Sequence, residues 1–277
     1  MTRIGTLTRA YRYPIKSMQG ESLDEATLGV LGIEGDRRWG VRDESRGDFM
    51  TGKRVAALMG CRARLVAGAA PEVELPDGHR FAADAPEANA RLSEALGRKV
   101  TLWPIGSAPP PGAEAERDSE EELAAMMARE EGEPAPDFSN IPEALLAFAA
   151  RPDRPYFDLS PLLLLTEQSL ATLAKAASDA QVDVRRFRPS LLVDATEAGD
   201  FPEQGWLGKR LRIGGAVIRV EMPCVRCVMT THGFAELPEA PRIMRSLVSE
   251  AAGNLGVYAS IERGGSLRAG DAVEAID

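Results

Sequence analysis

The N-terminal third of the chain consists of short runs in which hydrophobic and polar residues alternate, the pattern of half-buried β-strands. Turns that contain glycine separate four such runs, at residues 3–13, 22–30, 37–43 and 48–52. Strand-like runs continue to about residue 83, with a tight turn expected at Asp77-Gly78. This pattern predicts a compact antiparallel meander or barrel.

One helix is expected at the end of this β-rich part. Leu92, Ala95 and Leu96 share one face of the segment 85–97, and Gly97 stands where glycine commonly ends a helix. The strand-like run VTLW follows at 100–103.

Strands and amphipathic helices are mixed in the second half of the chain. The apolar run at 162–166 predicts a buried strand, and the leucines and alanines of 167–178 recur with helical spacing directly after it. A strand is expected at 190–194, a hairpin around Gly214-Gly215 and a helix at 237–253, before two closing strands. The pattern predicts two β-rich parts with helices packed outside.

Residues 106–140 differ in composition from both parts, since they mix prolines, acids and small residues. Such a composition buries little apolar surface, so we expect a linker or insertion between a domain at 1–105 and one at 141–277. A short helix at 120–130 whose methionine pair docks is the alternative. The composition favours a solvated acidic segment with no chemical role.

The net charge of −9 is concentrated in the same segment, because residues 113–133 hold nine acids against two arginines. The rest of the chain is nearly neutral and offers no broad basic stripe, which argues against nucleic-acid binding. No run approaches the roughly 18 apolar residues that a membrane span needs. Three cysteines are too few for a disulfide scaffold and indicate a reducing, cytoplasmic environment.

The most informative stretch is PCVRCVMTT, which places Cys224 and Cys227 after a strand-like run. A thioredoxin-type pair needs its first thiol at a helix N-terminus, but VMTT favours extended structure. A structural zinc site needs four ligands, and His79, His232 and Cys61 supply no second pair at the usual spacing. Inert buried cysteines remain an alternative. The other is a single soft thiolate metal ligand, with the adjacent arginine at position 226 favouring the thiolate and an anionic group.

Several basic residues stand at the ends of predicted strands. YPIKS contains Lys16 and Ser17, GDRRW contains Arg37, and FRPS places Arg188 before a proline at the mouth of a strand. A rigid backbone of this kind can aim a guanidinium at a ligand. Each residue alone has an ordinary surface position as its alternative.

The strand-to-helix turn from Thr166 to Ser169 offers hydroxyls, backbone amides and the positive end of a helix dipole. These groups make either a phosphate site or an ordinary helix cap. The standard glycine-rich nucleotide loops are absent, and two histidines without a G-x-S-x-G motif argue against a Ser-His-Asp or Cys-His hydrolase.

Together these motifs resemble the MOSC family, in which an N-terminal β-barrel partner domain precedes the MOSC domain. The opening YPIKSMQGESLDEATLGVLGIEGDRRW is similar to the partner domain, and LLLLTEQSLATL, RRFRPSLLVD, PCVRCVMTT and LGVYASIERGGSLRAGDAV are similar to MOSC blocks. The resemblance implies an α+β, β-rich fold with an N-terminal antiparallel β-barrel-like domain and a C-terminal MOSC β-barrel with peripheral helices.

The resemblance also implies a molybdenum–molybdopterin cofactor held between the two parts, with Cys227 as catalytic residue and metal ligand. The family's cofactor contacts fall on Lys16, Ser17, Arg37, Thr166, Ser169, Arg188, Ser190, Cys224 and Arg226. The function implied is an oxidoreductase that reduces small N-hydroxylated compounds with electrons from an external flavin or iron–sulfur reductase, since the chain has no iron–sulfur motif of its own. A non-redox carrier of the cofactor or its sulfur is the alternative, and an inert β-rich binding module is a third.

One departure from the family concerns the residues after the two threonines. Family members commonly continue T-T-V-D-P, whereas this chain reads Thr230-Thr231-His232-Gly233-Phe234 and lacks the acid. The implied substrate range therefore depends on what this segment does.

Overall fold

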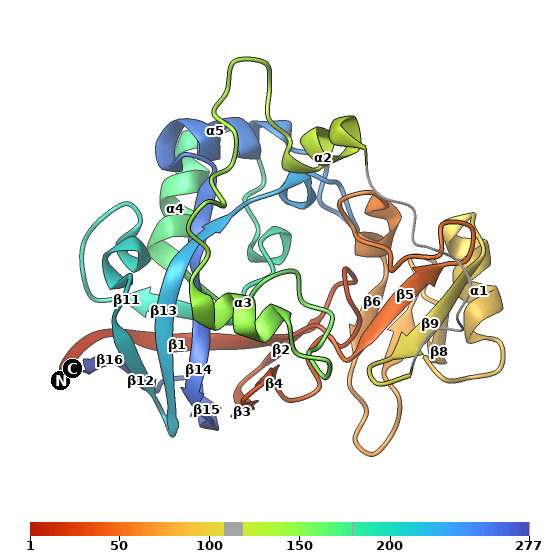
Figure 1. Ribbon diagram of the computed structural model, residues 1–277, viewed down its shortest axis with the longest axis horizontal. Coiled ribbons are helices and arrows are strands. Elements are labelled where there is room, and N and C mark those ends of the chain that lie inside the picture. Colours follow the sequence, from red (N-terminus) through yellow and green to blue (C-terminus); the bar gives the residue numbers. More distant parts are fainter. Residues whose placement is uncertain (108–118, 179, 277) are drawn as a thin grey trace.

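The computed structural model describes residues 1–107, 119–178 and 180–276 (Figure 1). Its largest element is a barrel of seven described strands in the order β11-β10-β14-β13-β12-β16-β1, closed by pairing of β1 with β11. Only β10 and β11 pair in parallel, and β2 (Glu21–Leu23) extends β1 outside the closed barrel. The barrel strands are β1 (Thr2–Arg12), β10 (Leu162–Thr166), β11 (Leu191–Ala195), β12 (Arg210–Ile213), β13 (Ala216–Val225), β14 (Asn254–Arg263) and β16 (Ala272–Ile276).

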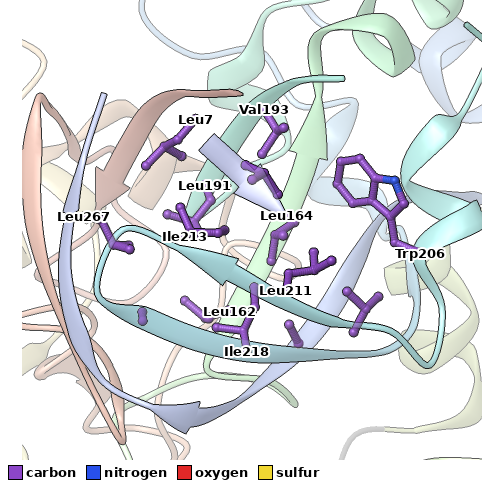
Figure 2. Packing of buried hydrophobic residues seen from close by; sticks show 14 of the residues in the cluster. Leu7, Leu162, Leu164, Leu191, Val193, Trp206, Leu211, Ile213, Ile218 and Leu267 are labelled. Atoms are coloured by element: carbon purple, nitrogen blue, oxygen red, sulfur yellow. The ribbon is translucent and has the colours of Figure 1, made fainter. Parts of the chain in front are cut away.

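The inside of the barrel is filled by branched aliphatic side chains, among them Leu7, Leu164, Leu191 and Ile218 (Figure 2). Trp206, at the end of the 3-10 helix η3 (Pro202–Trp206), packs against this core and is fully buried. A barrel of this size leaves no lumen, because its inward-facing side chains meet across the axis.

Two helices lie on the outside of the barrel here: α4 (Glu167–Ala176) covers β10 and β11, and α5 (Pro241–Ala251) packs against α4 and β14. Leu165 and Leu192 point to this side and pack with Leu173, Met244 and Leu247 in a separate core. With one face in the barrel and the other under helices, all five residues of β10 are buried. This explains why β10 reads as a continuous apolar run rather than as an alternating one.

The first strand of the chain belongs to this barrel. β1 pairs with β11 on one side and with β16 on the other, so it joins two strands that are far apart in the sequence. The sheet closes only because β1 fills the gap between them.

The rest of the N-terminal part contains small antiparallel sheets and a second core, which includes Met18, Val41, Leu58, Phe81 and Leu92. Helix α1 (Ala88–Leu96) ends at Gly97, which adopts the left-handed conformation expected of a terminating glycine (φ 64°). Two sheets surround this core: β5 (Trp39–Asp43) with β9 (Val100–Pro104), and β6 (Arg62–Arg64), β7 (Glu72–Glu74) and β8 (Arg80–Ala82). A third sheet, of β3 (Glu25–Gly29), β4 (Gly32–Ile33) and β15 (Gly265–Arg268), instead adds Leu28, Ile33 and Leu267 to the barrel core. The predicted α+β, β-rich fold with outer helices is confirmed.

The acidic segment differs from the solvated chain that its composition favoured. Residues 108–118 lie outside the described part, but α2 (Glu120–Met127) begins with a capping box between Ser119 and Glu122. Met126 is buried, and α2 packs against η4 (Val228–Thr230), the 3-10 turn after Cys227. A second helix, α3 (Glu143–Ala149), buries Phe148. Figure 1 shows α2 above the space between the barrel and the N-terminal sheets.

Candidate functional site

A cavity of about 380 Å³ lies between the N-terminal sheets and the barrel. Eight of the ten residues predicted from the sequence line it: Lys16, Ser17, Arg37, Arg188, Ser190, Cys224, Arg226 and Cys227. They come from loops after β1, β4 and η2 (Val184–Arg186) and from the end of β13. Loops at strand ends can carry charged groups around one space because the strands beneath them hold the backbone in place.

Three of these residues have strained backbone conformations. Ser17, Arg37 and Arg188 adopt positive φ angles of 68°, 49° and 53°, a region that non-glycine residues rarely occupy. Each such residue costs on the order of 1–3 kcal/mol, and strain of this kind gathers at ligand sites. Ser17 is further held by its hydroxyl, which accepts a hydrogen bond of 2.9 Å from the Gly52 amide.

Arg37 and Arg188 lie beside Tyr13. The guanidinium carbons are 4.7 and 4.3 Å from the centre of the Tyr13 ring, and Arg37 also lies 4.7 Å from the Phe157 ring. Buried Asp36 pairs with Arg37 and accepts the Tyr13 amide, whereas Arg188 donates to the Met18 carbonyl.

The two guanidiniums repel one another in a buried environment. Burial and then the charge of Arg37 lower the pKa of Arg188 to about 10, which still leaves it cationic at neutral pH. An anion bound between the two arginines would relieve this repulsion.

Two lysines form a second basic pair in the same cavity. Lys16 and Lys53 bind the two carboxylate oxygens of Asp158, at 2.6 and 2.9 Å. The charge of Lys16, with that of Lys53, holds the pKa of Asp158 far below its usual range, although desolvation acts to raise it. Burial would lower the pKa of Lys53, but Asp158 and the nearby cysteines outweigh it and raise that pKa.

The whole cavity therefore carries a large excess of positive charge. Of its described lining residues, six are cationic and only Asp158 is anionic. The cations are Lys16, Arg37, Lys53, Arg186, Arg188 and Arg226. A concave site with such an excess attracts an anionic ligand.

The two cysteines of the PCVRC segment have different surroundings. Cys224 is buried within β13 and accepts a hydrogen bond of 3.0 Å from Arg226 Nη1, whereas Cys227 lies just beyond the strand and is partly exposed. Arg226 also donates to the Phe187 carbonyl at 2.6 Å, and its buried Nε has no partner among the described residues. Burial acts to lower the pKa of Arg226, but the neighbouring Cys224 outweighs it and the pKa is raised.

This arrangement decides between several interpretations of the cysteine pair. Cys224 lies in a strand and not at the start of a helix, so the dipole that activates a thioredoxin-type thiol is missing. No group of three or more His, Cys, Asp or Glu side chains in the described ranges forms a metal site. A metal held by Cys227 must therefore bring most of its own ligands.

Thr166 and Ser169 lie outside the cavity. Their hydroxyls donate to the carboxylate of Glu203, at 2.6 and 2.5 Å, and all three side chains are fully buried. Glu203 also accepts the Gly256 amide at 3.2 Å, while Thr166 caps α4 through the Ser169 amide. The Glu203 carboxylate is thus the anion that these hydroxyls bind. We therefore do not include Thr166 and Ser169 in the site.

Three lining residues with clear roles were missed by the sequence analysis. Lys53 and Asp158 form the basic pair described above, and no motif marks either of them. Arg186 is fully buried and donates to the carbonyls of Gln181, His232 and Pro238 at 2.6–2.8 Å, so it holds the loop that follows Cys227. The neighbouring arginines of RRFR are indistinguishable from it by sequence.

Comparison with known families agrees with this two-part architecture. Residues 4–105 match the MOSC N-terminal beta barrel domain, and residues 152–274 match the MOSC domain. The chain belongs to the MOSC family. β1, which pairs with strands of the C-terminal barrel, falls within the range of the N-terminal match.

Curated relatives of this MOSC protein include mitochondrial amidoxime-reducing components. It is 31% identical over 131 residues to component 2 of Bos taurus, an alignment of 43% of this chain and 38% of that protein. It is 25% identical to component 1 of Mus musculus, over 99% of this chain and 83% of the relative. The YUAD protein of Bacillus subtilis aligns over 98% of this chain and 94% of its own, at 12% identity and a TM-score of 0.44.

In the described ranges, no helix combines the length and apolar character that crossing a bilayer requires. The cytoplasmic location stays a prediction, since the names of the relatives above place those proteins in mitochondria.

Proposed function

We propose that this chain binds a molybdenum–molybdopterin cofactor in the cavity between its two parts and reduces N-hydroxylated compounds with electrons from an external protein. The observation that carries the proposal is the partly exposed thiol of Cys227 at a cavity with six cations and one anion. The relatives named as amidoxime-reducing components support the reaction class.

The residues present fit such a cofactor. Molybdopterin carries a phosphate, and the unmatched cations together with the unpartnered Nε of Arg226 offer charge and hydrogen bonds to it. A soft thiolate suits molybdenum, and the single cysteine suffices because the pterin brings sulfur ligands of its own. The cavity volume also falls within the range of small-molecule sites.

The chain's own residues would divide the work between binding and positioning. Cys227 would supply the thiolate that binds the metal. The second thiol, Cys224, accepts a hydrogen bond from Arg226 instead. Arg37 and Arg188 would bind the anionic end of the cofactor from the N-terminal part and the barrel, respectively. Arg186 keeps the loop after Cys227 in place through its carbonyl contacts.

The cofactor, when bound, supplies the two-electron chemistry that removes oxygen from nitrogen. The overall reaction takes an N-hydroxylated compound, two electrons and two protons to the reduced nitrogen compound and water. The electrons would come from a flavin or iron–sulfur reductase, as the relatives described as reducing components suggest for a multi-protein system.

The test is to purify the protein from cells that make the cofactor and to measure molybdenum, pterin and benzamidoxime reduction with a chemical electron donor. We expect close to one cofactor per chain with turnover, and loss of both in Cys227→Ala. Cys61→Ala is the matched control, because Cys61 is buried in the N-terminal core and does not line the cavity.

Two results would contradict the proposal in different ways. Tightly bound cofactor without turnover, together with transfer to an acceptor apoenzyme, would indicate a carrier. Absence of cofactor, with no effect of Cys227→Ala, would remove the basis of the proposal altogether.

A further inference from the structure

A second cavity of about 410 Å³ lies next to the one described above. Lys53 lines both cavities. On α2, Met126 lines the second cavity and Met127 the first, and after β13 Val228 lines the second and Cys227 the first. The two cavities therefore adjoin at Lys53, at α2 and at the Cys227–Val228 segment.

Apart from Lys53, whose partner Asp158 lines the first cavity, the acids of the second cavity pair with arginines of the same cavity. Asp43 pairs with Arg98 at 2.9 Å and Asp48 with Arg54 at 2.6 Å. A third pair joins Arg46 to Glu122 of α2, at 3.4 Å. With each acid paired to an arginine, the cavity offers little to attract an ion of either sign.

The remaining surface of the second cavity is apolar and comes from three segments of the chain. Met50 and Val55 come from the N-terminal part, Ala125 and Met126 from α2, and Val228 from the turn after the proposed metal ligand. Apolar walls of this kind favour a ligand with an apolar body and no net charge.

Among the described lining residues, Lys53 is the one that the two cavities share. The backbone next to it is held by the hydrogen bond that the Gly52 amide donates to the Ser17 hydroxyl. Asp158 takes one of the three N–H groups of its ammonium. No second acceptor for this ammonium occurs in the described ranges, so its other N–H groups can bind an acceptor on a ligand.

We propose that the second cavity is the substrate chamber, that it takes uncharged N-hydroxylated compounds with an apolar body, and that Lys53 donates a hydrogen bond to the hydroxyl oxygen of the substrate next to Cys227. This inference rests on the proposed function for the identity of the reacting group.

The chamber is tested by filling it. Ala125→Trp places a large side chain in the second cavity, and Ala124→Trp is the matched control, since both alanines are exposed on α2 but only Ala125 lines the cavity. We expect Ala125→Trp to weaken benzamidoxime binding to the cofactor-free protein at least tenfold by calorimetric titration, with wild-type affinity in Ala124→Trp.

The same variants in the cofactor-loaded protein separate the chamber from the cofactor site. Molybdenum and pterin content should stay at the wild-type level in both variants, while kcat/KM for benzamidoxime falls at least tenfold in Ala125→Trp alone. Lys53→Met should lower kcat/KM by a similar factor, and Lys53→Arg should restore most of it, because the guanidinium keeps a donor at this point.

Equal binding and equal kcat/KM in the two tryptophan variants would overturn the inference while leaving the proposed function intact. A wild-type protein that never holds cofactor would instead overturn the proposed function, and the titration of the cofactor-free protein would still decide whether the second cavity binds benzamidoxime.

Discussion

Thr166→Val is the substitution that best separates a structural role from a cofactor-binding role at the start of α4. Valine keeps the volume of threonine but removes the hydroxyl. That hydroxyl donates to the buried carboxylate of Glu203 at 2.6 Å and accepts the Ser169 amide at 3.2 Å. The side chain is fully buried, so water cannot replace either contact.

The expected loss follows from these two contacts. A hydrogen bond to a charged group contributes about 1.5–3 kcal/mol, and removal of a helix cap costs about 1 kcal/mol. We therefore expect Thr166→Val to lower the free energy of unfolding by about 3 kcal/mol. Since Thr166 lies outside the cavity, the cofactor content of the folded protein should not change.

Urea denaturation of the cofactor-free protein measures the first quantity, and metal analysis of the folded fraction measures the second. Thr172→Val is the control on the same helix, because the Thr172 hydroxyl makes a long, exposed hydrogen bond to Asp200 and no other to a described residue. It should change stability by less than about 0.5 kcal/mol. A Thr166→Val protein that unfolds like the wild type but loses its cofactor would refute the assignment of Thr166 to a structural network.

Two further predictions concern acid stability and thiol reactivity. Burial acts to raise the pKa of Asp43, but hydrogen bonds from Ser45 and Arg98 outweigh it and lower the pKa from 3.8 to about 2. The ionised Asp43 carboxylate therefore contributes about 2 kcal/mol to stability above pH 4, and this contribution is lost as the pH falls through 2. The stability difference between wild type and Asp43→Asn should shrink by that amount between pH 5 and pH 2. Urea denaturation at each pH measures it. In the cofactor-free protein at pH 8, iodoacetamide should modify Cys227 much faster than Cys61. Cys61 is buried, and burial raises its pKa to about 11. Equal modification rates by mass spectrometry would show that the cavity does not expose Cys227.

The elements that local patterns determine were predicted well from the sequence. The strand at 162–166, the helix after it and the helix ended by Gly97 depend on neighbouring residues, which a single sequence displays directly. Pairing of β1 with β11 and β16 depends on strands nearly 200 and 270 residues away, and alternation within β1 carries no information on its partners.

The candidate site divides in the same way. Residues in distinctive motifs, such as Arg188 and Cys227, meet at the cavity. Lys53 and Asp158 stand in no motif, and only the folded chain brings them together as an ion pair at the cavity. The Thr166–Ser169 turn has the residue types of a phosphate site, but only the structure shows that Glu203, more than 30 residues later, occupies it.

The most direct test of the account is X-ray absorption at the molybdenum edge for protein purified with its cofactor. The measurement is made on the fraction of each variant that retains molybdenum. The account predicts one sulfur neighbour fewer at the metal in Cys227→Ser and an unchanged number in Cys224→Ser. An unchanged number of sulfur neighbours in Cys227→Ser, or the loss of one in Cys224→Ser, would contradict the assignment of Cys227 as the metal ligand.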